Sequence, residues 1–158
     1  RFKTWVAPAS RSVANRFKPV CAFFLVDNNR AEFGRWFSQA ERDLKAARSS
    51  LKGSYFEWSC FQSQQAAEKA LKAFLSLKGR RGLLTHSVFA LLNECIAVDK
   101  RFGELRDCKE LDQYYVPTRY PGVLPDGAAP FEFYRLEEAE RCASFAARIL
   151  ARVRESAK

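Results

Sequence analysis

The stretch from Ser54 to Gly79 constrains the fold most, because it is long, amphipathic and marked at both ends. Its apolar side chains recur at spacings of four, seven, four and three residues. At about 100° per residue, this spacing places them on one side of a helix. Ser54 and Glu57 have the spacing of a capping box, and Gly79 stands where a left-handed residue ends a helix. The stretch therefore predicts one long helix, and its inward side chains are Phe56, Cys60, Ala67, Leu71 and Phe74.

The opposite side of this helix is polar. It carries Gln62, Gln65, Lys69 and Lys72, with Trp58 one turn earlier. Such a face is typical of a helix that contacts a ligand or a partner. It is equally typical of lysines that stay in water and a tryptophan that packs against a neighbouring helix, so both interpretations stay open here.

The rest of the chain has helical spacing too. We expect further helices at about residues 30–52, 87–98, 102–115 and 132–156. In the helix at 102–115, we expect Leu105, Cys108, Leu111 and Tyr115 to face the core. A very short turn at Gly53 predicts that the first two helices are antiparallel neighbours. The predicted fold class is all-α, an up-and-down bundle of four to five helices formed by residues 30–158.

Residues 1–29 are basic and show no reliable periodicity, so we expect a poorly structured extension or linker. Their composition resembles a mitochondrial transit peptide, although a linker from a longer polypeptide has the same character. The apolar run at 20–26 is the exception, and it predicts an extended segment docked on the bundle or a short strand. The absence of Met indicates a fragment or a processed form.

Composition restricts the class of protein. No apolar run approaches the roughly 18 residues of a membrane span. The five cysteines are odd in number and widely spread, which argues against a disulfide framework or a zinc site and favours a reducing compartment. We therefore expect a cytoplasmic protein, with a mitochondrial location as the alternative, and no metal or cofactor.

The net charge of +9 is uneven along the chain. Residues 1–30 hold six of the 27 Lys and Arg but only one of the 18 acids. The remaining excess of positive charge is compatible with a phosphate-bearing ligand, but it falls short of what a dedicated duplex-DNA binder carries.

His86 is the only histidine, and Arg81 precedes it by five residues. An imidazole that titrates near neutral pH can act as general base or acid toward a ribose 2′-hydroxyl, while a guanidinium stabilises the phosphate charge. The pair therefore predicts a metal-independent ribonuclease. The alternative is that His86 caps or packs at the start of a helix.

Arg119 lies between Tyr115 and Tyr120 in a segment rich in proline. A guanidinium suits phosphate, and a tyrosine ring can stack on a base. The other cations that we expect near this ligand are Lys69, Lys72, Arg80 and Arg81. The alternative is that Arg119 forms an ion pair with Asp112 or Glu132 and attaches the loop at 116–131 to the bundle.

Three segments together resemble the HEPN domain family, whose name denotes nucleotide binding in higher eukaryotes and prokaryotes. The segments run from Trp36 to Leu44, from Trp58 to Lys72 and from Leu111 to Pro121. The Gln-Gln-Ala-Ala-Glu block followed downstream by Thr-Arg-Tyr-Pro carries most of the resemblance. The resemblance covers about residues 31–156 and implies a bundle of four to five helices that commonly pairs as a homodimer.

Members of this family include partners of minimal nucleotidyltransferases, ribonuclease toxins and the C-terminal domain of the chaperone-like protein sacsin. The ribonuclease branch places an Arg-x4–6-His motif late in the domain, where this chain has Arg119 but no histidine after it. The resemblance therefore implies, first, a non-catalytic module that binds a nucleotide and dimerises, with a nucleotidyltransferase or chaperone as partner. The alternatives are a toxin-like endoribonuclease using Arg81 and His86, and a purely structural homodimer or antitoxin-binding bundle.

Overall fold

The computed structural model describes residues 18–158, with side-chain surroundings for residues 28–125 and 127–158. This part of the chain contains helices and no strand, which confirms the predicted all-α bundle. The α-helices are α1 (Lys18–Lys52), α2 (Phe56–Leu77), α3 (Val88–Val98), α4 (Pro130–Phe133) and α5 (Leu136–Ser156). The 3₁₀ helices are η1 (Lys100–Tyr114), η2 (Pro121–Val123) and η3 (Pro125–Gly127).

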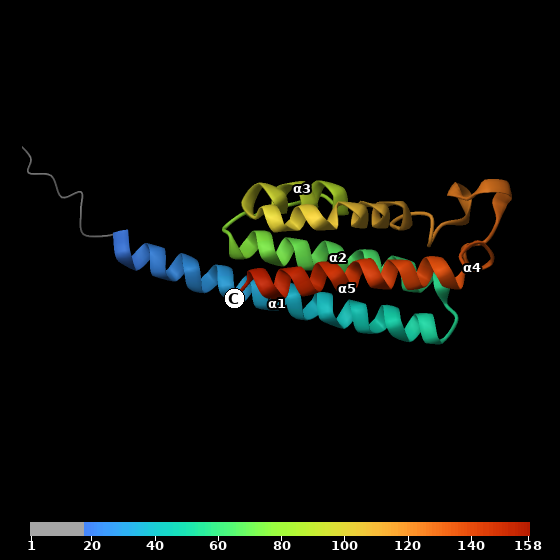
Figure 1. Cartoon of the computed structure of the whole chain (residues 1–158), viewed down its shortest axis with the longest axis horizontal. Helices are drawn as coiled ribbons and strands as arrows, with labels where there is room; N and C mark the ends of the chain where they lie inside the picture. Colours follow the sequence, from blue (N-terminus) through green and yellow to red (C-terminus); the bar gives the residue numbers. More distant parts are fainter. Residues whose placement is uncertain (1–17) are drawn as a thin grey trace, which may run out of the picture.

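Helix α2 is the centre of the bundle. It packs against α1 and α5 on one side and against α3 and η1 on the other (Figure 1). The short turn between α1 and α2 makes them antiparallel, as expected. The irregular segment between η1 and α5 lies at the end of the bundle where α2 begins (Figure 1).

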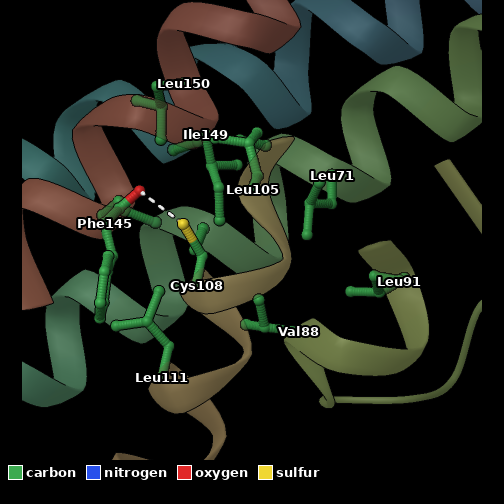
Figure 2. Packing of buried hydrophobic residues seen from close by; sticks show 14 of the residues in the cluster. Leu71, Val88, Leu91, Leu105, Cys108, Leu111, Phe145, Ile149 and Leu150 are labelled. Carbon is green, nitrogen blue, oxygen red and sulfur yellow. Dashed lines mark hydrogen bonds between the residues drawn. The ribbon is translucent and has the colours of Figure 1, made fainter. Parts of the chain in front are cut away.

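The core lies between these elements, and Figure 2 shows how α2, α3, η1 and α5 contribute to it. The inward residues predicted for α2 are fully buried from Cys60 onward, and Phe56 is partly buried. The ring of Phe74 packs on that of Phe102 with centroids 4.6 Å apart. Burial of several such side chains, each contributing about 1.5–3 kcal/mol, drives the helices together.

The two ends of α2 differ from each other in how well they were predicted. Gly79 does end the helix: its φ is +78°, and the N–H of Arg80 donates to the carbonyl of Leu75 at 2.9 Å. The capping box is wrong. Ser54 itself has a φ of +61°, and the helix begins after Tyr55 with no side-chain cap. The tight turn after α1 forces Ser54 into the left-handed region, so its hydroxyl cannot cap.

Helix α1 begins at Lys18, well before the expected residue 30. Residues 20–26 are therefore helical, and both the extended and the strand interpretation are wrong for them. A short apolar run cannot distinguish strand from helix by periodicity, and Pro19 suits the first turn of a helix. The expectations for residues 1–17 concern residues outside the described part. Helix α5, by contrast, begins later than expected, at Leu136 and not at about residue 132, because the short α4 precedes it.

The helix predicted at 102–115 is the 3₁₀ helix η1, and its burial pattern explains why. Its buried residues recur at every third position, and they are Phe102, Leu105, Cys108, Leu111 and Tyr114. A 3₁₀ helix has three residues per turn, so side chains three apart lie directly above one another. The inward residue at the end is therefore Tyr114 and not Tyr115, which is only half-buried.

Asp112 joins the end of η1 to the start of α3. Its carboxylate accepts hydrogen bonds from the hydroxyl of Ser87 at 2.6 Å and from the backbone N–H of Phe89 at 3.1 Å. It also accepts one from the N–H of Val88. These bonds satisfy the free donors of the first turn of α3. They also keep the residues just beyond η1 close to the residue just before Ser87, which is His86.

Candidate functional site

His86 lies against the middle of α2, at the end of the segment that joins α2 to α3. Its carbonyl accepts a hydrogen bond from the Nε2 of Gln64 at 2.8 Å. Its Nδ1 lies 3.2 Å and 3.4 Å from the two carboxylate oxygens of Glu68. The His86 side chain is 55% exposed, whereas the Glu68 side chain is 5% exposed. The imidazole is thus held from the protein side and open to solvent on the other.

Glu68 has further partners besides His86, since Gln64 and Gln65 donate to its Oε2 at 3.4 Å and 3.3 Å. The Nζ of Lys72 donates to its Oε1 at 2.9 Å, and the Lys72 side chain is only 10% exposed. A buried carboxylate is costly unless it is paired, and Lys72 supplies the countercharge. Because a carboxylate only accepts, Nδ1 of His86 carries the proton in its bond to Glu68. In the neutral ring, Nε2 then holds the lone pair.

The polar side of α2 extends this network towards α1. Lys69 donates to Asp43 at 2.6 Å and to Gln65 at 3.2 Å, and Gln65 donates to Gln64 at 2.8 Å. Lys69 and Lys72 are therefore bonded to internal carboxylates, and the expectation of lysines that stay in water is wrong. Among the described residues, two of the predicted ligand cations already have an acidic partner in this network.

Tyr115 connects His86 to Arg119. The imidazole stacks on the Tyr115 ring with centroids 4.9 Å apart and planes 15° apart. The guanidinium carbon of Arg119 lies 5.0 Å from the centre of the same ring. Arg119 also donates to the Tyr115 carbonyl from Nε at 3.1 Å and from Nη2 at 2.7 Å. The two candidate sites of the sequence are thus one site, with a single aromatic ring between them.

The surroundings of Arg119 are aromatic. Its guanidinium carbon lies 4.3 Å from the Phe61 ring and 5.2 Å from the Tyr120 ring. The predicted ion pairs with Asp112 and Glu132 are wrong, because Asp112 caps α3 and Glu132 accepts from the backbone N–H at Ala129 at 3.3 Å. Within the described part of the chain, the positive charge of Arg119 is not neutralised by a carboxylate.

Arg81 does not join His86. Its Nη2 donates to the Oδ1 of Asn29 at 2.6 Å and lies 3.7 Å from a carboxylate oxygen of Glu32 on α1. The segment after α2 runs back along that helix from its C-terminal end to Gln64. An extended run of five residues can separate two Cα atoms by about 17 Å, so nearness in sequence does not bring these side chains together.

Arg80 forms an ion pair with Glu94 on the surface. With Lys72 and Arg81, it lines a small cavity of about 50 Å³ beside Trp36. The three cations in this cavity are each paired with a carboxylate. Of the five predicted ligand cations, Arg119 is thus the one that pairs with no acid among the side chains that the structure describes.

Sequence reasoning missed Glu68, Gln64 and Phe61. Glu68 and Lys72 have the i, i+4 spacing of a helical ion pair, so that pairing was readable. The burial of Glu68 and Lys72 could not be predicted from the sequence, because it depends on which elements cover the polar face of α2. The approach of His86 to Glu68 spans 18 positions and had no local signal.

Titratable groups on the core side of the site are shifted toward their neutral forms. Burial raises the pKa of Tyr114 to about 12, although a hydrogen bond from Arg141 opposes this. A hydrogen bond with Cys142, together with burial, raises the pKa of the Cys60 thiol. Near pH 7 these groups are uncharged, so they contribute packing to the site.

The sequence model of the HEPN domain matches residues 33–156. The chain belongs to the HEPN domain family. A protein of Methanocaldococcus jannaschii, named "Putative toxin MJ1304", is 31% identical over 134 residues, which are 78% of this chain and 86% of that protein. The match leaves residues 1–32 outside the HEPN domain, so α1 begins before the domain does.

Solved HEPN-type structures share the fold. TT1696 of Thermus thermophilus is 36% identical with a TM-score of 0.70, and the match covers 78% of this chain and 97% of that one. ST0689, described as an archaeal HEPN homologue, is 40% identical with a TM-score of 0.64, covering 80% and 98% of the two chains. The HEPN bundle of this chain is therefore shown by sequence and by structure.

Two properties concern the described residues alone. None of their helices combines the length and the apolar character that crossing a membrane requires. Within the same residues, no group of three or more His, Cys, Asp or Glu side chains is placed to hold a metal ion.

Proposed function

We propose that this HEPN protein is a metal-independent endoribonuclease in which His86 transfers the proton and Arg119 binds the phosphate. One observation carries the proposal: a half-exposed imidazole is held through Nδ1 by a buried carboxylate, and its ring stacks on the same tyrosine as a guanidinium that pairs with no acid among the described side chains. A histidine that serves only packing does not need a buried carboxylate behind it and solvent in front of it.

The chemistry follows from the lone pair on Nε2 of His86. Nε2 accepts the proton of a ribose 2′-hydroxyl, and the 2′-oxygen attacks the adjacent phosphorus. The bond from phosphorus to the 5′-oxygen breaks, which leaves a 2′,3′-cyclic phosphate and, after protonation, a 5′-hydroxyl. Arg119 stabilises the negative charge that develops on the phosphoryl oxygens. The nucleophile belongs to the substrate, so the reaction does not require a metal-bound water.

The relative from Methanocaldococcus jannaschii carries the name of a toxin, which supports a toxin-like activity here. The proposal changes one role predicted from the sequence. Arg119 takes the place of Arg81 as the phosphate-binding cation, because Arg119 contacts the same Tyr115 ring as the imidazole. Arg81 is engaged with Asn29 and Glu32.

The test is cleavage of labelled RNA in the presence of EDTA. His86→Ala is expected to lower the rate by about 100-fold or more, as removal of a general base does. Arg119→Ala is expected to lower it as well. The matched control is Arg81→Ala, which should cleave like wild type. Cleavage that survives in His86→Ala, or a wild-type protein that does not cleave RNA, would remove the proposal.

A second candidate function is the non-catalytic binding of a nucleotide at Arg119. It is favoured by the position of this guanidinium near three aromatic rings. A base can stack on such rings while the guanidinium binds the phosphate of the same nucleotide. Titration with nucleoside triphosphates separates the two candidates. Under this second function, Arg119→Ala loses about tenfold in affinity, or roughly 1.4 kcal/mol, and His86→Ala binds normally without any cleavage.

The homodimer and the nucleotidyltransferase or chaperone partner stay predictions from the family resemblance. Light scattering at micromolar concentration tests the dimer directly. A monomer there would also count against the purely structural alternative, which requires a second subunit against the bundle.

A further inference from the structure

Aromatic side chains continue from Arg119 along the first turns of α2. Trp58 is 45% exposed and lies outside the hydrophobic core cluster. Its ring meets the edge of Phe61 at a centroid distance of 6.2 Å and an angle of 75°. Phe61 in turn lies 6.4 Å from the Tyr115 ring and 4.3 Å from the guanidinium of Arg119. The guanidinium of Arg119 also contacts the ring of Tyr120, which is 52% exposed.

We name Trp58, Phe61, Arg119 and Tyr120 the stacking surface. The packing of the bundle does not fully account for it, because its outer members, Trp58 and Tyr120, are about half exposed. Tyr120 flanks the guanidinium directly and Trp58 reaches it through Phe61, so flat apolar faces lie near a cation that pairs with no acid among the described side chains. A nucleic acid base and its phosphate have the complementary combination of a flat ring and a negative charge.

We propose that the stacking surface binds the bases of a single-stranded nucleic acid beside the phosphodiester that His86 and Arg119 act on. Its placement relative to a scissile bond rests on the proposed ribonuclease function, but the binding itself does not. A duplex does not fit this description, because its bases are already stacked on one another and present only their edges and the backbone. Trp58 is the determining residue, since it has the largest ring of the surface and is 45% exposed.

The experiment measures the anisotropy of fluorescein-labelled oligothymidylate titrated with the full chain at one fixed salt concentration. DNA lacks the 2′-hydroxyl, so the probe is not cleaved and binding is measured alone. Trp58→Ala is expected to weaken binding at least tenfold, whereas Trp58→Phe should stay within about threefold of wild type. The matched control is Phe131→Ala, an aromatic residue that is 68% exposed on α4 and lies outside the stacking surface.

Each outcome decides the inference. A loss in Trp58→Ala but not in Phe131→Ala, together with weaker binding of the same sequence as a duplex, supports it. Equal affinity of wild type and Trp58→Ala, equal affinity for single strand and duplex, or absence of binding overturns it. If binding depends on Trp58 but RNA is not cleaved, the stacking surface stands and the ribonuclease function fails. If RNA is cleaved at the same rate by wild type and Trp58→Ala and oligothymidylate binding is also unchanged, the ribonuclease function stands and the stacking surface fails.

Discussion

Replacing Glu68 by Gln tests whether the site rests on a buried charge pair. Gln has nearly the same size and keeps one acceptor oxygen, so the substitution removes the charge and one of the two oxygens that accept in this network. It leaves the ammonium of Lys72, whose side chain is 10% exposed, without its countercharge at 2.9 Å. Breaking a buried pair on one side costs about 3–5 kcal/mol, and the retained acceptor favours the lower end. We expect the free energy of unfolding to fall by about 3 kcal/mol.

Urea unfolding followed by circular dichroism measures this change. With a denaturant slope of about 1–3 kcal/mol per molar, the midpoint should fall by roughly 1–3 M at unchanged slope. Glu94→Gln is the matched control. Glu94 pairs with Arg80, and both side chains are close to half exposed, so its loss should cost less than about 1 kcal/mol.

A second substitution in the same background separates charge from shape. Lys72→Met removes the unpaired ammonium, so the double variant Glu68→Gln/Lys72→Met should recover most of the lost stability. If Glu68→Gln alone unfolds within about 1 kcal/mol of wild type and no differently from Glu94→Gln, the pair is not buried in solution. The proposal that a buried Glu68 carboxylate holds Nδ1 of His86 would then be contradicted.

Two other predictions concern the scaffold. Gly79→Ala should cost about 1 kcal/mol, because φ is +78° there. Gly103 lies inside η1 with open space at its Cβ position, so Gly103→Ala should instead stabilise the protein by about 0.5–1 kcal/mol. Urea unfolding compares the two variants. Burial raises the pKa of the Cys108 thiol from 9.0 to about 12, so above pH 9 the unfolded chain loses this proton first and stability should fall as pH rises. Cys108→Ala should make that fall shallower in unfolding measured across this range, and an unchanged slope would contradict it.

Much of the fold was predictable because amphipathic spacing is a local property. The inward residues of α2, the stop at Gly79 and the start of α3 after Ser87 all follow from residues within one or two turns. Helix η1 was placed correctly but assigned the wrong end residue, since three-residue spacing is compatible with both helix types until the neighbours are known. The start of α1 was misplaced because residues 20–26 are apolar on every side.

The candidate site was predictable in its parts and not in its assembly. His86, Tyr115 and Arg119 were each singled out by their chemistry, but His86 was matched to Arg81, its neighbour in sequence. The structure instead joins His86 to Arg119, which is 33 positions away in the chain, through Tyr115. Asp112 makes this possible, since it ties the end of η1 to the start of α3.

The sequence by itself determined that this chain forms a helical bundle of the HEPN type and which side chains carry usable chemistry, because helical period and residue type are read locally. Only the tertiary structure decided which charges remain unmatched. Lys69, Arg80 and Arg81 each meet an acid brought by packing, whereas Arg119 meets aromatic rings. The physical reason is that an ion pair depends on the distance between two side chains, and that distance is set by how the helices pack.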